Sequence, residues 1–181
     1  LKMNDQFQAD LKDGKLMPEE GEDITDTIKI LQAAQPKSTL LNNPVLIGRY
    51  ADMIRQNVNS NDYQQADQVL KVALDYAPKD AELLNLQDQV TRELKREQDA
   101  QLIAQLEGRI KAAVPHLHDL SDFEKVRDDM LKLHALNPGD ALLQKLNDPL
   151  KSALQNALVS ATQQKQWGQA ESALYAYSHL L

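Results

Sequence analysis

The sequence has 181 residues, with 20 Lys and Arg against 27 Asp and Glu, which gives a formal net charge of −7. This acidic balance argues against nucleic-acid binding, because no basic stripe stands out to neutralise phosphates. The absence of cysteine excludes disulfides and thiolate metal sites, but it does not separate the cytosol from an envelope compartment. No apolar run approaches membrane-spanning length and no signal peptide is visible, so we expect no membrane insertion within this segment.

Leu, Ala, Ile and Val must build the hydrophobic core, since the chain has only two Phe and one Trp. β-Branched residues rarely cluster, which favours an all-helical fold. The length allows either one domain with a sizeable core or a short array of repeats. Both ends of the chain lie inside amphipathic patterns, and we interpret it as an excised piece of a longer protein.

The first part of the chain predicts two short amphipathic helices. One covers 3–11, with Phe7 and Leu11 one turn apart. The other carries an apolar stripe from Ile24 to Leu31 and is ended by a proline. Acidic residues precede and open this second helix, where the macrodipole favours them, so we prefer a structural role over a cation site. These residues are Glu19, Glu20, Glu22, Asp23 and Asp26.

Residues 14–36 read GKLMPEEGEDITDTIKILQAAQP. A Gly-basic-Leu sequence, a proline and an acidic turn containing glycine lead here into a helix that closes on proline. This arrangement resembles a variant repeat common in bacterial envelope proteins. The resemblance implies a bacterial protein of the periplasm, with the cytoplasm as the alternative location.

The segment 61–78, NDYQQADQVLKVALDYAP, predicts a helix with one apolar stripe. We expect Asn61 to cap it in a capping box with Gln64, and Pro78 to end it. A second amphipathic helix lies upstream and ends near Asn59. Because only a short polar turn separates the two helices, we expect them to pack antiparallel. The stripe consists of Ala66, Val69, Leu70, Ala73, Leu74 and Ala77.

This pair of helices resembles a tetratricopeptide repeat. Ala66 and Ala73 match the small residues at which helices of that family approach closely, Leu70 matches the packing residue between them, and Pro78 matches the terminating proline. The apolar positions of the first helix are matched by Tyr50, Met53 and Ile54. The resemblance implies a right-handed solenoid of helical hairpins that serves as a binding scaffold.

The pattern recurs twice further along the chain. Phe123 takes the position of Tyr63 after 60 residues, and Trp167 takes it again after a further 44. Ser121 with Glu124 predicts a second capping box. We therefore expect a single repeat domain over 1–181, with four divergent units at roughly 1–36, 44–78, 80–138 and 140–181. The residues expected to be buried between helices are Ala66, Leu70, Ala73, Val126, Met130, Leu133, Ala170 and Leu174.

The segment 80–114 contains no glycine or proline except Gly108, and it predicts either one very long helix or two shorter ones. Its part 91–101 is heavily charged and is expected to face solvent. Pro115 is expected to end the element. An apolar stripe runs along most of the segment through Leu83, Leu86, Val90, Leu94, Leu102, Leu106 and Ile110.

Signals for catalysis, metals and cofactors are weak. His116 and His118 with Asp119 come closest to a metal site, but no second histidine pair completes the ligand set. The polar residues of 57–62 lack the glycine and the final glutamate of a calcium loop. No glycine-rich phosphate loop, nucleophile elbow or pair of catalytic carboxylates is recognisable. We expect a non-enzyme that folds without metal or cofactor.

The leading functional hypothesis is a non-catalytic protein–protein interaction scaffold that binds a peptide or a partner protein on a concave helical surface. It would be the docking or sensing region of a bacterial envelope protein. Two alternatives stay open. One is a self-associating structural module, with a homodimer formed through 80–114, and the other is the regulatory domain of an enzyme whose catalytic part is absent.

The resemblance to tetratricopeptide repeats also implies where a partner binds, since the first helix of each hairpin lines the concave face in that family. Apart from Asp52, the corresponding residues are neutral or basic on an acidic protein. They therefore favour an extended peptide with carboxylates, held by Arg55 and by side-chain amides that reach its main chain. The residues assigned to this surface are Asp52, Arg55, Asn59, Lys111, Gln155, Asn156 and Gln163.

Overall fold

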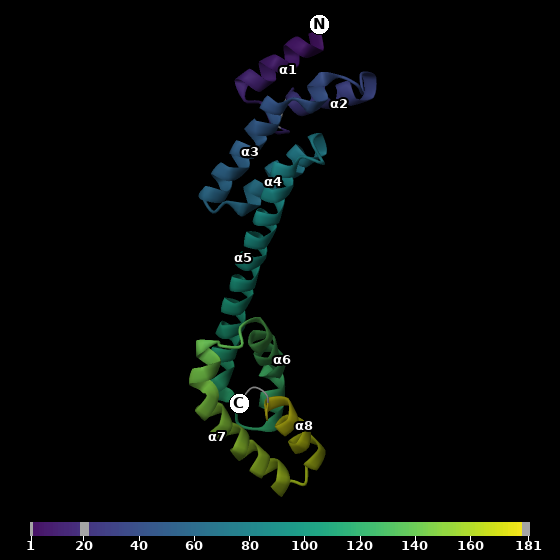
Figure 1. Cartoon of the computed structure of the whole chain (residues 1–181). Helices are drawn as coiled ribbons and strands as arrows, with labels where there is room; N and C mark the ends of the chain where they lie inside the picture. The colour runs from purple at the N-terminus through teal and green to yellow at the C-terminus, as the bar shows by residue number, and fades with distance from the viewer. Residues whose placement is uncertain (1, 19–21, 179–181) are drawn as a thin grey trace. The chain divides into compact units, whose positions relative to one another are not determined.

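Helices make up nearly all of the regular structure. The computed structural model describes residues 2–18 and 22–178, and within these ranges it contains eight α-helices, two short 3₁₀-helices and no β-strand (Figure 1). The all-helical prediction is confirmed. The α-helices are α1 (Lys2–Asp13), α2 (Ile24–Ala34), α3 (Pro44–Asn59), α4 (Tyr63–Tyr76), α5 (Ala81–Ala113), α6 (Leu120–Leu136), α7 (Ala141–Gln163) and α8 (Trp167–Ser178). The 3₁₀-helices are η1 (Thr39–Asn42) and η2 (Val114–His116).

The residues gather into two compact units, Leu1–Arg96 and Glu97–Leu181, and the boundary between them falls inside α5. Each unit has a hydrophobic core of its own. The boundary lies within 80–138, which the sequence pattern groups as one repeat. The grouping of all residues into a single domain of four repeats stays a prediction.

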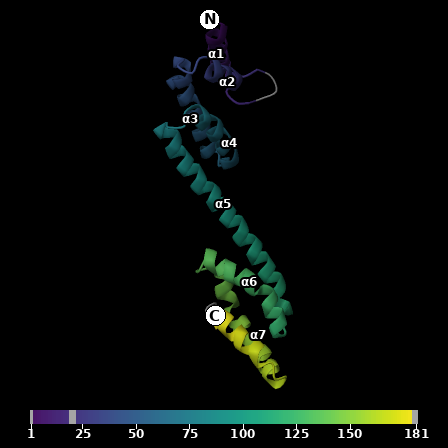
Figure 2. The same cartoon turned by 90° about the vertical axis from the view of Figure 1, so that its right-hand side faces the viewer.

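The core of the first unit lies between α1 to α4 and the first turns of α5. Figures 1 and 2 both show α3 and α4 side by side. Tyr50 and Ile54 of α3 are fully buried, as are Ala66 and Ala73 of α4, so the predicted stripes of both helices face this core. The other helices contribute Phe7, Leu11, Ile24, Ile28, Leu31, Leu83, Leu86 and Val90.

The core of the second unit lies between the C-terminal part of α5 and the helices α6, α7 and α8. Phe123 of α6 and Tyr177 of α8 meet at its centre, with ring centroids 5.2 Å apart and ring planes at 72°. This is an edge-to-face contact, one of the favoured geometries of aromatic pairs. The Tyr177 hydroxyl also donates a hydrogen bond to the Phe123 carbonyl. The predicted burial of Val126, Met130, Leu133 and Ala170 is confirmed.

Among the eight residues predicted to be buried between helices, Leu174 is the one for which the prediction is wrong. Its side chain is 55% exposed. The helix α8 packs through Ala170, Ala173 and Tyr177 instead. Because α8 carries apolar residues on two of its faces, its periodicity does not select one of them. The contact of Tyr177 with Phe123 selects the face that packs into the core, and it leaves Leu174 outside.

A residue in the left-handed conformation follows three of the helices. Gly14, Asn61 and Lys165 have φ angles of 75°, 58° and 59° and come directly or shortly after α1, α3 and α7. In each turn, the residue that follows the left-handed one donates its N–H to the carbonyl of the residue five positions earlier in the chain. This is the longer hydrogen bond of a Schellman motif. The pairs are Lys15 with Asp10, Asp62 with Asn57 and Gln166 with Ala161. The turn between α3 and α4 thus recurs between α7 and α8.

A proline turn follows three other helices. Gln35, Ala77 and Asn137 end α2, α4 and α6, and each donates its N–H to the carbonyl four residues before it. A proline comes next in every case and disfavours helical backbone at the preceding residue, which explains why the helix stops. The second residue after each proline then caps the following helix with its side chain. These capping residues are Ser38, Asp80 and Asp140.

Two predicted helix caps are wrong by one or two positions. Asn61 does not cap α4, because it occupies the left-handed position of the preceding turn. Asp62 caps α4 instead, and its carboxylate accepts a hydrogen bond from the backbone of the first turn. Ser121 lies inside the first turn of α6. The capping box of that helix is formed by Asp119 and Asp122.

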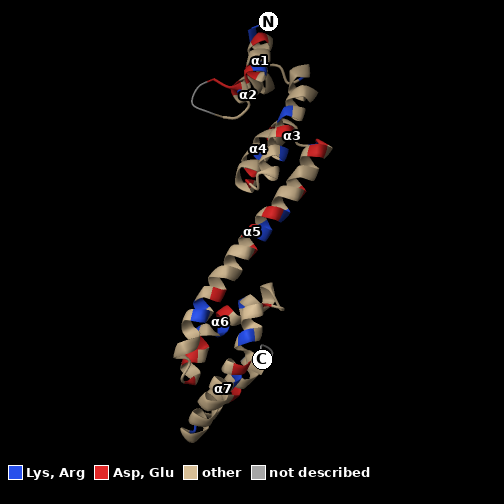
Figure 3. Cartoon of the chain, turned by 90° about the vertical axis from the view of Figure 1, so that its left-hand side faces the viewer, with Lys and Arg blue, Asp and Glu red and all other residues tan. Residues whose placement is uncertain are grey.

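The helix α5 is continuous over 33 residues, so the segment predicted to form one long helix or two forms one. Its first turns belong to the core of the first unit, whereas Leu106 and Ile110 belong to the core of the second. Residues 95–102 include no buried side chain, and Leu102 is 38% exposed. Figure 3 shows Lys, Arg, Asp and Glu along this helix. The prediction that most of its charged stretch faces solvent is confirmed.

Pro149 lies inside α7, eight residues after its start, and the helix continues past it to Gln163. Proline has no N–H, so it cannot donate the helical hydrogen bond to the carbonyl of Lys145. Pro44, which occupies the matching place in the sequence pattern, stands at the beginning of α3, where a proline costs nothing. The two Asx-Pro sequences therefore have different roles.

Candidate functional site

The three predicted site residues of the first unit lie together on the exposed side of α3. Asp52, Arg55 and Asn59 are spaced by three and four residues, which keeps them on one face of the helix. The same face continues towards the start of the helix through Arg49 to Val45, whose side chain is 57% exposed. We refer to these five residues as the α3 face.

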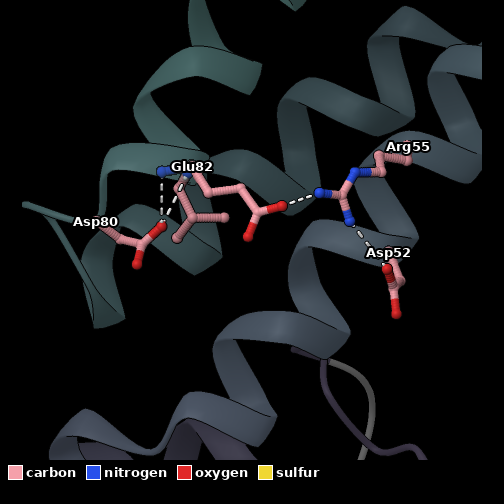
Figure 4. Close-up of polar contacts among 5 residues, drawn as sticks. Asp52, Arg55, Asp80 and Glu82 are labelled. Carbon is pink, nitrogen blue, oxygen red and sulfur yellow. Dashed lines mark hydrogen bonds and ion pairs between the residues drawn. The ribbon is translucent and has the colours of Figure 1, made fainter.

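Arg55 is held by two carboxylates of the chain itself (Figure 4). One guanidinium nitrogen lies 3.0 Å from the Asp52 carboxylate, one turn earlier on α3. The other forms an ion pair with Glu82, in the first turn of α5. Glu82 is positioned there because Asp80 caps α5 and accepts hydrogen bonds of 3.0 Å from the N–H groups of Glu82 and Leu83.

This pairing changes what the α3 face offers to a partner. The positive charge of Arg55 is compensated by Asp52 and Glu82, so a carboxylate of a bound peptide must compete with them. The side chains of Arg55 and Glu82 are about half exposed, at 49% and 46%, and that of Asp52 is 77% exposed. Ion pairs with this much contact to solvent contribute only about 0–1 kcal/mol. Exchange of one carboxylate for another is therefore energetically easy. The ion pair of Arg55 with Asp52 can be inferred from their spacing of three residues on one helix. The ion pair with Glu82 joins two helices, and sequence analysis did not predict it.

The other predicted site residues lie in the second unit. Lys111 is exposed near the end of α5, and Gln155, Asn156 and Gln163 are exposed on α7. Gln155 lines a groove between α7 and α8, whereas Lys111, Asn156 and Gln163 do not. The seven residues thus divide into three in the first unit and four in the second, and the structure places only Asp52 and Arg55 in contact with each other.

The groove beside Gln155 lies between α7 and α8 and is lined largely by apolar side chains. It has a volume of about 300 Å³. We call it the α7–α8 groove and define it by the residues Lys151, Leu154, Gln155, Leu158, Leu174, Tyr177 and Ser178. The second apolar face of α8, which carries Leu174, is the signal for this groove in the sequence.

A second hollow, of about 430 Å³, lies between α2, α3 and α4 in the first unit. Two of its polar side chains, Tyr50 and Thr25, form hydrogen bonds within the protein. The Tyr50 hydroxyl donates to the Leu16 carbonyl at 2.7 Å, and the Thr25 hydroxyl donates to the Asp23 carboxylate at 2.5 Å. Burial raises the pKa of Tyr50, so its hydroxyl keeps its proton at neutral pH. The first of these bonds ties α3 to the segment before α2, and the second belongs to the N-terminal cap of α2.

The candidate metal ligands do not form a cluster. Within the described part of the chain, no group of three or more His, Asp or Glu side chains could hold a metal ion. His116 and His118 are exposed, and the N–H of His118 donates to Asp122 in the capping region of α6. That hydrogen bond holds the pKa of Asp122 below its usual range. Of the acidic residues before α2, Asp23 caps the helix, while Glu19 and Glu20 lie outside the described residues.

Among the residues that the structure describes, no helix combines the length and the apolar character that crossing a membrane requires.

The fold and these surfaces define an all-α protein with two separate candidate surfaces, one polar and one largely apolar. Comparison with known protein families, with curated proteins and with solved structures finds no match to the chain.

Proposed function

We propose that the chain is a non-catalytic helical-repeat scaffold that binds a peptide or a partner protein. The observation that carries the proposal is the recurrence of two turns. A Schellman-type turn follows α1, α3 and α7, and a proline turn with a side-chain cap follows α2, α4 and α6. Such repetition is typical of proteins in which hairpins of similar build stack on each other and expose the first helix of each hairpin to ligands.

The α3 face is the surface on which we place the partner in the first unit. The short amide side chain of Asn59 can hydrogen-bond the main chain of an extended peptide. Arg55 can receive a carboxylate from that peptide if the carboxylate replaces Glu82. An acidic, extended peptide therefore remains the preferred ligand, with an affinity limited by the competition inside the chain. Following its likeness to bacterial envelope repeats, we propose the periplasm as its location.

The test begins with peptides selected from a random library for binding to the immobilised chain. Their affinities are then measured by calorimetry on variants. The double substitution Arg55→Ala with Asn59→Ala should weaken binding about tenfold, equivalent to about 1.4 kcal/mol. Glu82→Gln should strengthen the binding of acidic peptides, since it removes the competing carboxylate. Lys71→Ala, on the exposed side of α4, is the matched control and should leave the affinity unchanged.

Unchanged affinity in the double variant, with circular dichroism showing an intact fold, would contradict this surface. An acidic peptide that binds Glu82→Gln no better than the wild type would contradict the proposed exchange of carboxylates at Arg55. Failure of both tests, together with measurable enzyme activity of the chain, would contradict the proposed function as a whole.

A further inference from the structure

The hollow between α2, α3 and α4 is lined by buried side chains at its base and by exposed side chains at its rim. Tyr50 of α3 belongs to the base and is fully buried. Lys29 and Gln32 of α2 and Asp75 of α4 belong to the exposed lining. The volume of about 430 Å³ lies in the lower part of the range of roughly 300–1,000 Å³ that is usual for small-molecule sites. The hollow therefore has the size and the polarity of a site for a small ligand with an apolar body and a polar end.

The buried part of the lining offers mainly apolar surface, because its hydroxyl groups donate their hydrogen bonds within the chain. This holds for Tyr50, Thr25 and Tyr76. Burial raises the pKa of both tyrosines, so neither carries a charge at neutral pH. The apolar body of a ligand would therefore meet the tyrosine rings and the side chains of Ile28 and Val72.

Two opposite charges border the hollow from different helices. Lys29 lies on α2, and Asp75 lies near the end of α4. The Lys29 amino group is 3.7 Å from the Asp26 carboxylate, and both side chains are exposed, so this ion pair is weak. The side chains of Asp75 and Gln32 form no hydrogen bond or ion pair with another residue in the part of the chain that the structure describes. The rim thus offers a cation, an amide and a carboxylate to a ligand.

We propose that this hollow binds a free α-amino acid with an apolar side chain, such as leucine or phenylalanine. The side chain of the ligand packs against Tyr50. Its ammonium group pairs with Asp75, and its carboxylate accepts hydrogen bonds from Lys29 and Gln32. An α-amino acid carries both charges next to one carbon atom, so both stay at the rim when its side chain is buried. The site shares no residue with the α3 face and does not depend on the proposed scaffold function.

Ligands that carry only one of these charges fit the rim less well. A cation without a carboxylate meets Lys29 as a like charge, and an anion without an ammonium group meets Asp75 in the same way. The same holds for the end of a peptide chain, which keeps only one of the two charges next to its last side chain. The net charge of −7 further disfavours an anion, whereas it exerts no net attraction or repulsion on a zwitterion. We therefore commit to a free amino acid.

The test measures binding to the full chain by isothermal titration calorimetry. Leucine and phenylalanine are the probes. Their amides, which lack the carboxylate, and their N-acetyl derivatives, which lack the ammonium group, serve as references, and glycine is a reference without an apolar body. We expect a probe to bind at least about tenfold more tightly than each of its references. Because the ligand binds the folded state, it should also raise the thermal midpoint of the chain as its concentration increases.

Variants then locate the two charges. Asp75→Asn and Lys29→Gln should each weaken the amino acid about tenfold. Asp75→Asn should also weaken the amide but not the N-acetyl derivative, whereas Lys29→Gln should do the reverse, a difference that damage to the fold would not produce. Asp88→Asn on α5 and Lys71→Gln on α4 are the matched controls, because they remove the same charges from exposed residues outside the hollow. Both controls should bind like the wild type.

Three results would overturn the proposal. The first is the absence of both binding heat and a thermal shift with either probe at about 10 mM. The second is an amide or an N-acetyl derivative that binds as tightly as the amino acid, which would show that the rim recognises a single charge. The third is an unchanged affinity in both Asp75→Asn and Lys29→Gln. None of these results bears on the α3 face, whose variants test the proposed scaffold function separately.

Discussion

Three buried tyrosines fix segments that are far apart in the sequence. Tyr50 donates to the carbonyl of Leu16, Tyr76 to that of Leu40, and Tyr177 to that of Phe123. Burial raises the pKa of all three hydroxyls, because an ionised phenolate would lose its hydration. At the scale of single residues, the core is therefore held by polar anchors as well as by apolar packing.

These anchors predict a loss of stability in alkali. A group whose folded pKa is raised contributes stability that is present below its unfolded pKa, about 10 for tyrosine, and is lost as the pH rises through the folded value. We expect the free energy of unfolding, measured in urea, to fall above pH about 10. In the variant Tyr50→Phe with Tyr177→Phe this fall should be smaller, although the variant starts about 1 kcal/mol lower for each lost hydrogen bond. An identical fall in both proteins would contradict the assignment.

Ala66 gives the sharpest test of the close contact between α3 and α4. Its side chain is fully buried. Ala66→Arg would place a charge and a long side chain where the helices touch, and should cost several kcal/mol, on the order of 3–5. Gln64→Arg, on the exposed side of the same helix, is the control and should change stability by less than about 0.5 kcal/mol. A variant Ala66→Arg that melts at the wild-type temperature would show that the contact is not formed.

Single residues also show where prediction from sequence ends. Helical spacing was sufficient to place Ala66, Leu70 and Met130 in the cores, because each lies on a helix with one apolar face. It failed for Leu174, where two faces compete and a tertiary contact decides. The candidate site follows the same rule. Exposure of Arg55 follows from its place on α3, but its ion pair with Glu82 joins residues 27 positions apart and leaves no trace in local spacing.

At the scale of elements, the turns repeat along the chain more regularly than the helices do. The helices differ in length from 11 to 33 residues, whereas the hydrogen bonds of the two turn types are conserved from copy to copy. Different side chains satisfy one backbone geometry: Gly14, Asn61 and Lys165 all occupy a left-handed position. Lysine is the least suited of these residues. Its Cβ atom crowds the following carbonyl in this conformation, whereas glycine has no Cβ atom and asparagine can compensate through local hydrogen bonds.

This difference predicts a stabilising substitution. Lys165→Gly removes the Cβ atom at φ 59° and should raise the stability of the second unit by about 0.5–1 kcal/mol, after the entropy of the added glycine in the unfolded chain is subtracted. Gln164→Gly is the control, since its φ is −85° and glycine offers no relief there. It should lower stability instead. Chemical denaturation of both variants measures the difference, and equal effects would show that the left-handed turn stores no strain.

At the scale of the whole molecule, the buried residues form two separate hydrophobic cores. One core contains buried residues from Phe7 to Val90 and the other contains buried residues from Leu106 to Tyr177, and none of the described residues belongs to both. The part of α5 at 95–102 contains no buried side chain. Sequence periodicity found the apolar residues on both sides of this stretch, but it could not divide them between cores, because the division depends on which helices pack against α5.

Separate cores predict separate unfolding, which native-state hydrogen exchange can resolve. Leu133 is fully buried in the second core, and Leu133→Ala should destabilise that core by about 2–5 kcal/mol. Amides of α6, α7 and α8 should then exchange faster by the factor that this energy implies, while those of α3 and α4 keep their wild-type rates. Amides of 95–102 should exchange fastest within α5 in both proteins, since no tertiary packing protects that stretch. A uniform acceleration across α3, α4 and α6 would show that the chain unfolds as one cooperative body.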